Sequence, residues 1–226
     1  MYLFELVGNE NHPAYKQLQV ENLDRQYSFV RSIVNASLAV QQPLLSIEVV
    51  KALNYHAISC LHVSAGEFRT CHVQAGDLHP PMPHQVPALM QMFTNFVNRL
   101  WDTTDAVFLA ALVLWRLNAI HPFVNGNGRT ARVASYFVLC LKSGGWLAGD
   151  KILPERIVEV HGEYVEALKV AHASALAGQV DLKPLHALLV RLLDDQMKDA
   201  EQNGDQGLII PPAATNLSTG APPATP

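Results

Sequence analysis

The residues best suited to chemistry lie together in one segment, residues 121–132, which we call the signature segment. It reads His-Pro-Phe-Val-Asn-Gly-Asn-Gly-Arg-Thr-Ala-Arg. Gly126 and Gly128 alternate with small amides, so that successive backbone N–H groups can converge into an anion-binding nest. The apolar spacing after the segment predicts a helix over 130–141. The positive end of that helix dipole would face the nest, which favours phosphate.

Three charged or titratable side chains flank this turn. Arg129 and Arg132 lie on the first helical turn, where both guanidinium groups can meet one polyphosphate. Two arginines at the positive end of a helix are unfavourable unless an anion compensates them, although solvated or capping roles are alternatives. His121 precedes the turn and has a side chain whose ordinary pKa suits a general base near neutral pH. The arrangement indicates an enzyme that acts on nucleotide phosphates.

The signature segment resembles the motif of the Fic (Fido) family, His-x-Phe-x-Asp/Glu-Gly-Asn-Gly-Arg-x-x-Arg, with one departure. Asn125 stands where the family has an acidic residue. Residues 61–69 resemble the lead into the family's β-hairpin flap, and residues 164–168 and 181–185 resemble its C-terminal helical region. The likeness covers residues from about 22 to about 195. It implies an all-α, Fic-type helical bundle with one small β-hairpin flap.

The resemblance also implies a role for each polar position. His121 would be the catalytic base, while Asn127 and the backbone of Gly126 and Gly128 would hold the α-phosphate of ATP. Arg129 would bind near the β-phosphate and Arg132 the γ-phosphate. Phe123 has no polar role and is predicted to be a core anchor of the loop.

Two further expectations come from the family. The flap residues Glu67, Phe68 and Arg69 would bind the target protein, because an exposed strand edge can pair with another backbone. The residue at position 125 would ligate Mg²⁺, a hard cation that prefers carboxylate oxygens and phosphates. The amide of Asn125 carries no charge, so we expect Mg²⁺ to be held weakly and to arrive with ATP.

The implied activity is transfer of AMP from ATP to a hydroxyl side chain of a target protein, with release of pyrophosphate. The alternatives are a catalytically weak or silent protein-binding module of the same fold, and transfer of another phosphate-containing group. Many family members carry an inhibitory Ser/Thr-x-x-x-Glu helix. The nearest sequence, residues 32–37, has Ala36 where the glutamate would be. A separate inhibitory partner is therefore one expectation, and a slow enzyme is the other.

Composition limits the class of protein. The chain has 226 residues, of which 49% are hydrophobic, and a net charge of −4, so it lacks the basic footprint of a nucleic-acid-binding protein. Three cysteines without CxxC spacing indicate reduced thiols and a cytoplasmic setting. The apolar run 106–120 is shorter than the roughly 20 residues that cross a bilayer, and the N-terminus does not resemble a signal peptide. We expect no membrane segment.

Helical periodicity and capping residues dominate the rest of the sequence. The organisation expected is an N-terminal extension (1–21), a Fic domain (22–199) and a disordered tail rich in Pro, Ala and Thr (200–226). A hairpin is predicted at residues 67–73 between two glycines. The other elements expected are helices over about 22–40, 46–62, 86–101, 106–120, 154–177 and 182–199, with Ser46 capping the second and Thr104 or Asp105 the fourth.

Overall fold

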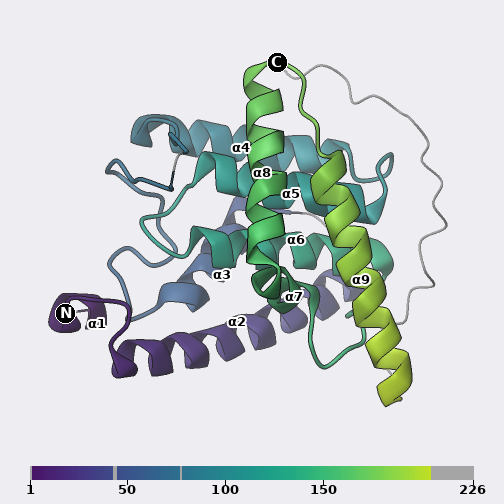
Figure 1. Cartoon of the computed structure of the whole chain (residues 1–226), viewed down its shortest axis with the longest axis horizontal. Helices are drawn as coiled ribbons and strands as arrows, with labels where there is room; N and C mark the ends of the chain where they lie inside the picture. Colours follow the sequence, from purple (N-terminus) through teal and green to yellow (C-terminus); the bar gives the residue numbers. More distant parts are fainter. Residues whose placement is uncertain (1, 43–44, 77, 205–226) are drawn as a thin grey trace. The chain divides into compact units, whose positions relative to one another are not determined.

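Helices α5 (Ala106–Ile120) and α6 (Asn127–Ser143) pack along each other and form the core of the first part of the chain (Figure 1). Two thirds of the residues of α5 are buried, as its apolar composition predicts. Asp105 begins α5, since its Oδ1 accepts a hydrogen bond from the Phe108 N–H at 2.8 Å. Among the described helices, none is long and apolar enough to cross a membrane.

The computed structural model describes residues 2–42, 45–76 and 78–204. Contacts divide the chain into two compact units, residues 1–146 and residues 147–226. The remaining elements of the first unit are α1 (Leu3–Val7), α2 (Pro13–Ala39), α3 (Ile47–Ile58), a 3₁₀ turn (Pro83–Gln85) and α4 (Val86–Arg99). Those of the second are α7 (Leu153–Glu159), α8 (His161–Leu176) and α9 (Lys183–Asn203). The described residues are mostly helical, as the sequence predicts.

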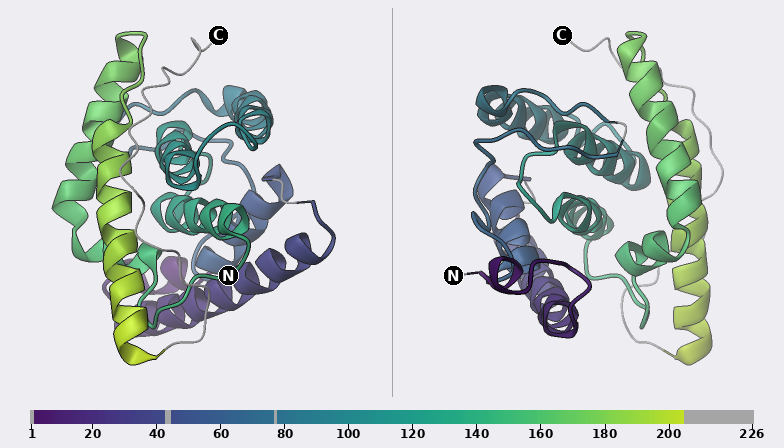
Figure 2. Two further views of the ribbon diagram at one scale, coloured as in Figure 1. Left: turned by 90° about the vertical axis from the view of Figure 1, so that its right-hand side faces the viewer. Right: turned by 60° about the vertical axis from the view of Figure 1, so that its left-hand side comes forward.

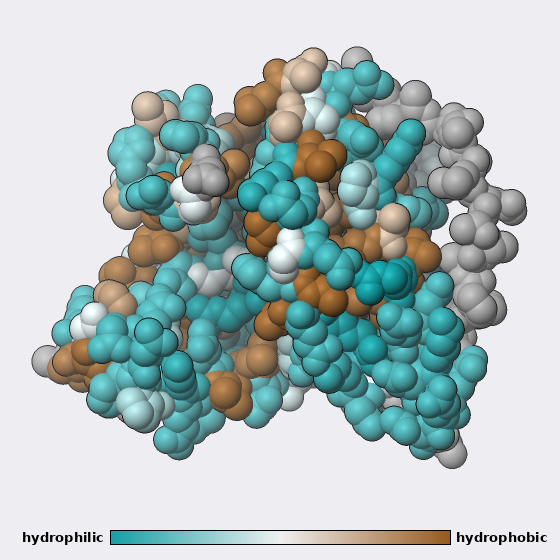
Figure 3. All heavy atoms as spheres, in the orientation of Figure 1, coloured by the Kyte–Doolittle hydropathy of each residue, from teal (hydrophilic) through white to brown (hydrophobic). Residues whose placement is uncertain are grey.

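Helix α2 begins nine residues earlier than expected. Pro13 occupies its first position, where a missing N–H costs nothing, and the His12 side chain accepts from the Ala14 N–H. Tyr15 is fully buried and anchors this first turn. The domain boundary expected between residues 21 and 22 therefore lies inside α2. Helix α1 contacts α2 near the N-terminal end of α2 (Figure 2). The exposed flank of α2 is mostly hydrophilic (Figure 3).

The hairpin expected at residues 67–73 is not found. Among the described residues of this connection there is no strand, and one isolated antiparallel bridge joins Ala75 to Leu78. The cause is Arg69, whose backbone N–H donates to the Pro122 carbonyl at 2.9 Å and whose side chain turns inward. These bonds hold residues 67–73 against the signature segment, so residues 67–73 do not form a hairpin.

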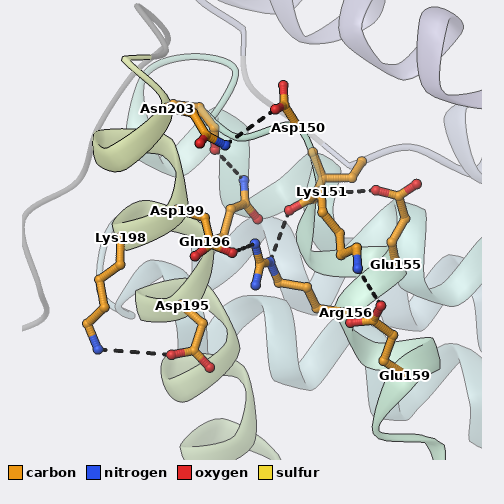
Figure 4. Close-up of polar contacts among 12 residues, drawn as sticks. Asp150, Lys151, Glu155, Arg156, Glu159, Asp195, Gln196, Lys198, Asp199 and Asn203 are labelled. Carbon is orange, nitrogen blue, oxygen red and sulfur yellow. Dashed lines mark hydrogen bonds and ion pairs between the residues drawn. The ribbon is translucent and has the colours of Figure 1, made fainter.

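In the second unit α8 packs against α9, and α7 contacts both. The single helix expected over 154–177 breaks at Val160, whose φ and ψ are −102° and 36°. Arg156 is buried and joins two chain segments, because its Nη2 lies 2.6 Å from Asp199 Oδ2 and its Nε donates to the Lys151 carbonyl (Figure 4). Helix α9 extends past residue 199 to Asn203. Most of the tail expected at 200–226 lies outside the described residues.

Helix α3 fixes the start of α6 by close packing. Its N-terminus is capped by Ser46, as the sequence predicts, through a 3.1 Å bond from the Val49 N–H. Gly126, the N-cap of α6, has a left-handed φ of 77°, and a β-carbon added there would lie 2.6 Å from Ile58 Cγ2 of α3. Gly144, at the other end of α6, is also left-handed (φ 86°) but has open space around it.

These two glycines allow backbone strain to be separated from close packing. We expect Gly144→Ala to cost about 1–2 kcal/mol of unfolding free energy for the left-handed conformation alone. Gly126→Ala should cost about 1–3 kcal/mol more, because Ile58 has to move. Gly162→Ala, in α8 with no such constraint, should be close to neutral. Denaturant unfolding of the three variants measures this, and equal losses at the two helix ends would contradict the packing argument.

Candidate active site

The signature segment forms the turn between α5 and α6. His121 ends α5 in the left-handed conformation, with φ 50° and ψ 60°, and its N–H donates to the Leu117 carbonyl at 2.9 Å. Gly126 then starts α6. The turn thus places the carboxyl end of one buried helix beside the amino end of another.

The surroundings of His121 favour its neutral imidazole. Burial lowers the pKa of its imidazole below the ordinary value, and the nearby Arg69 guanidinium lowers it further. A contact at 3.4 Å between Nδ1 and the Asn118 carbonyl oxygen acts in the opposite direction. Because a carbonyl only accepts, this contact favours a hydrogen on Nδ1 and leaves Nε2 as the basic nitrogen.

Arg69 holds this histidine in place. Its side chain is buried, and Nε donates to the His121 carbonyl at 2.7 Å. The same guanidinium donates to the carbonyls of Cys71, Pro81 and Ile120. A cation that satisfies the last carbonyls of α5 also interacts favourably with the helix dipole. The Arg69 side chain is enclosed and holds the end of α5, while its assignment to target binding stays a prediction.

The other two flap residues remain at the surface. Glu67 is exposed and forms an ion pair with Lys51 at 2.8 Å. Phe68 is half-buried, with its ring centroid 5.7 Å from that of Phe123. These side chains therefore lie beside the loop that carries His121, and they are available to a second molecule.

Asn127 braces the turn from within. Its Oδ1 accepts from the Phe123 N–H at 2.9 Å and its Nδ2 donates to the Phe123 carbonyl at 2.8 Å. Phe123 is fully buried, as the sequence predicts for a core anchor. The Asn127 side-chain amide is thus engaged with the backbone of Phe123 and shapes the turn.

The start of α6 presents backbone donors. The N–H groups of Asn127, Gly128 and Arg129 are the first of the helix and have no acceptor within it. A β-carbon on Gly128 would lie 3.3 Å from Arg132 Nη1, so this guanidinium reaches back over the first turn. Donors and cation together suit a phosphate.

Asn54 is a site residue that the sequence analysis missed. It is fully buried in α3, and its Nδ2 donates to the Asn125 carbonyl at 2.9 Å and to Thr130 Oγ1 at 3.2 Å. Its Oδ1 accepts from the Gly66 N–H at 3.0 Å. One amide therefore fastens both the turn and the segment that leads to Arg69. The sequence feature that could have indicated this role is a polar residue, Asn54, among the apolar residues of α3.

Arg129 and Asn125 pair with each other. Arg129 Nη2 donates to Asn125 Oδ1 at 2.9 Å, and Nη1 donates to the Ala57 carbonyl near the end of α3, also at 2.9 Å. Asn125 Nδ2 donates to Glu10 Oε1 at 3.0 Å. Arg129 thus ties the turn to α3 while it remains beside the proposed phosphate site.

The Asn125 side chain does not fit the role of a Mg²⁺ ligand that the sequence analysis expected for position 125. The single ligating oxygen of Asn125 accepts from a guanidinium, and a second cation at that oxygen would be repelled. No group of three His, Cys, Asp or Glu side chains with metal-binding geometry occurs in the described part of the chain. A carboxylate does contact the Asn125 side chain, that of Glu10, from the connection between α1 and α2.

Comparison with known proteins agrees with the motif. Residues 44–139 match the model of the Fic/DOC family. The chain is 36% identical over 153 residues to the protein adenylyltransferase Fic of Drosophila willistoni and 38% identical to that of Drosophila melanogaster. Each match covers 67% of this chain but 28% of the relative, so the chain spans less than a third of the curated relatives' length.

Solved structures share the fold. A Fic family protein from Desulfovibrio desulfuricans G20 matches with a TM-score of 0.64 at 18% identity, over 86% of this chain and 55% of that one. A Fic domain-containing signalling protein from Bacteroides thetaiotaomicron matches with 0.64 at 22% identity, over 88% and 79%. Fic-1 of C. elegans matches with 0.58 at 26% identity, over 80% and 52%. With the signature segment at the junction of α5 and α6, the chain belongs to the Fic/DOC family.

Proposed function

We propose that this chain is a nucleotidyltransferase that moves AMP from ATP to a Ser, Thr or Tyr hydroxyl of a target protein and releases pyrophosphate. The observation that carries the proposal is a neutral, positioned His121 beside the phosphate-binding start of α6. The adenylyltransferase names of the fruit-fly relatives support this choice over other transferred groups.

His121 acts as the general base. Its Nε2 takes the proton of the target hydroxyl while the hydroxyl oxygen forms a bond to the α-phosphorus of ATP. The bond from that phosphorus to the bridging oxygen breaks, and pyrophosphate leaves with the electron pair. The left-handed backbone and the Arg69 contact fix the main chain of His121, and the Asn118 carbonyl lies 3.4 Å from Nδ1, so little reorganisation would precede transfer.

The start of α6 stabilises the charge on the phosphates. The N–H groups of residues 127–129 and the helix dipole lie where the α-phosphate would bind, and Arg132 extends toward the γ-phosphate. Arg129 would contact the β-phosphate with the guanidinium hydrogens that are not used by Asn125, Ala57 and Tyr15. Because the turn's own side chains do not fit a metal ion, no step here depends on one.

The target approaches from the side of Glu67 and Phe68. The backbone near these residues is not in a described strand, so pairing with an extended target segment would have to be formed on binding. The exposed Glu67 carboxylate and the Phe68 ring offer one polar and one apolar contact. They would place the target hydroxyl near His121.

Replacing the base tests the function directly. The protein is incubated with α-labelled ATP and Mg²⁺, first as its own acceptor and then with cell lysate, and labelled protein is measured. His121→Ala should lower transfer by roughly 10²–10⁴-fold while ATP binding remains. His84→Ala, an exposed histidine, is the control. Wild-type protein that binds ATP but labels nothing would favour the silent binding module.

The burial of His121 also makes a prediction about pH. A base with a lowered pKa stays neutral at more acidic pH, so transfer should decline only below the ordinary histidine value of about 6.5. The acidic limb of kcat/KM against pH reports the free enzyme and is the measurement to make. A limb centred above that value would contradict the neutral-base assignment.

Arg132→Ala should weaken ATP far more than AMP, because AMP lacks the phosphate that Arg132 would contact. Charge-assisted hydrogen bonds contribute about 1.5–3 kcal/mol, which corresponds to roughly tenfold or more in affinity. Calorimetry of both nucleotides measures this, with the exposed Arg99→Ala as control. Equal losses for ATP and AMP would rule out the γ-phosphate assignment.

A further inference from the structure

Arg129 is held by acceptors from three different parts of the first unit. Its Nη1 donates to the Ala57 carbonyl of α3 and its Nη2 to Asn125 Oδ1 in the turn, both at 2.9 Å. A third hydrogen bond joins the guanidinium to the hydroxyl of Tyr15, in the first turn of α2. Because a guanidinium is planar and rigid, these bonds fix its plane and leave its other N–H groups for a ligand.

The Tyr15 hydroxyl has a second partner. Tyr15 is fully buried, and its oxygen lies 2.7 Å from Nε2 of His62, a buried residue that follows α3. Since a guanidinium only donates, the Tyr15 oxygen accepts from Arg129, and the hydroxyl hydrogen can go to His62. Tyr15 therefore connects the guanidinium to the imidazole.

The protonation states of this pair agree with that direction. Burial raises the pKa of Tyr15, so the phenol keeps its hydrogen at neutral pH. Burial lowers the pKa of His62, although the Glu10 carboxylate, 3.4 Å from Nε2, acts in the opposite direction. A neutral imidazole has one nitrogen that can accept a hydrogen bond. The hydrogen bonds thus run from Arg129 to Tyr15 and from Tyr15 to His62.

Helix α1 covers this pair. The ring centroid of Phe4 lies 4.7 Å from that of His62 and 6.4 Å from that of Tyr15. The backbone N–H of Phe4 donates to the Leu61 carbonyl at 3.1 Å, which docks α1 on the chain just after α3. The Tyr15 hydroxyl is therefore enclosed by packed rings, and it has little room to move away from the guanidinium.

A second path from the N-terminal residues reaches the same guanidinium. Glu10, in the connection between α1 and α2, accepts from Asn125 Nδ2 at 3.0 Å, and Asn125 Oδ1 accepts from Arg129. The amide of Asn125 is thus fixed with its oxygen toward the guanidinium. Tyr15 and Asn125 hold Arg129 through two separate sets of contacts.

We infer that Tyr15 and His62 are positioning residues for nucleotide binding, and that their hydrogen bonds orient the Arg129 guanidinium so that its remaining N–H groups meet the β-phosphate. This inference rests on the proposed function, which assigns Arg129 to that phosphate. A group that is already oriented binds an anion with less loss of side-chain entropy than a mobile one. The start of α2 therefore contributes to the preference for nucleotides that carry a β-phosphate.

The test compares ADP with AMP by calorimetry, without turnover. ADP carries the β-phosphate but lacks the γ-phosphate that Arg132 is proposed to contact. The measured quantity is the ADP preference, which is the Kd of AMP divided by the Kd of ADP. Tyr15→Phe keeps the buried ring and removes the hydroxyl, so the ADP preference should fall by about 3–10-fold, while the Kd of AMP changes by less than about twofold.

The matched control is Tyr164→Phe. Tyr164 is a buried tyrosine of α8, in the second unit, and its ring centroid lies 6.4 Å from that of His161. This variant should keep the wild-type ADP preference. His62→Leu removes the acceptor of the Tyr15 hydrogen and should lower the preference, whereas His62→Gln, whose amide can still accept, should retain more of it.

A double-mutant cycle separates positioning from a general structural role. Arg129→Ala should lower the ADP preference by roughly tenfold or more, because it removes a charge-assisted contact. In that background Tyr15→Phe should change the preference no further, since Tyr15 acts through Arg129. If the alanine variant does not fold, Arg129→Lys replaces it, because an ammonium group cannot reproduce the planar set of donors.

The outcomes distinguish the inference from the proposed function. A folded Tyr15→Phe protein that keeps the ADP preference, or that loses ADP and AMP affinity equally, would overturn the inference. An effect of Tyr15→Phe that is the same with and without Arg129 would also overturn it. If Tyr15→Phe does not fold, equal ADP preferences in His62→Leu and the wild type have the same meaning. A wild type that binds neither nucleotide would instead overturn the proposed function, and the inference with it.

Discussion

The site depends on one constraint: a short turn joins two buried helices, and its backbone polar groups must find partners inside the protein. An unpaired buried donor or acceptor costs about 1–3 kcal/mol. Three side chains meet this demand, namely Arg69 at the end of α5, Asn127 inside the turn and Asn54 at the start of α6. Each engages backbone atoms, so the turn is restrained at both ends and in its middle. The position of His121 follows from these restraints.

The same constraint explains why the flap segment is not a hairpin. Arg69 donates to four carbonyls, and its own N–H is used by Pro122. The backbone N–H of Arg69 is thus bonded to the signature segment and is not available to a hairpin ladder. The contacts of this segment with α5 and with the turn that carries His121 therefore outweigh its local β-propensity.

What the sequence could predict was local. The apolar period of α5, the caps Ser46 and Asp105, and the buried Phe123 all follow from neighbours within a few residues, and the structure has them. The roles of Asn54, Arg69 and Glu10 depend on contacts 71, 52 and 115 residues apart. No period or spacing encodes such contacts. The motif located the site, but the side chains that hold it in place required the packed helices.

The pairing of Glu10 with Asn125 changes how the first 21 residues are understood. Tyr15 is fully buried, and Leu3 and Phe4 form backbone hydrogen bonds with the residues that follow α3, so these residues are packed against the first unit. The start of α6 already concentrates positive charge from its dipole and its two arginines. The Glu10 carboxylate, which accepts from Asn125 Nδ2 at 3.0 Å, brings a negative charge beside this positive end from outside the turn. The hydrogen bond between Glu10 and Asn125 is therefore part of the packing by which the N-terminal residues hold the turn before α6.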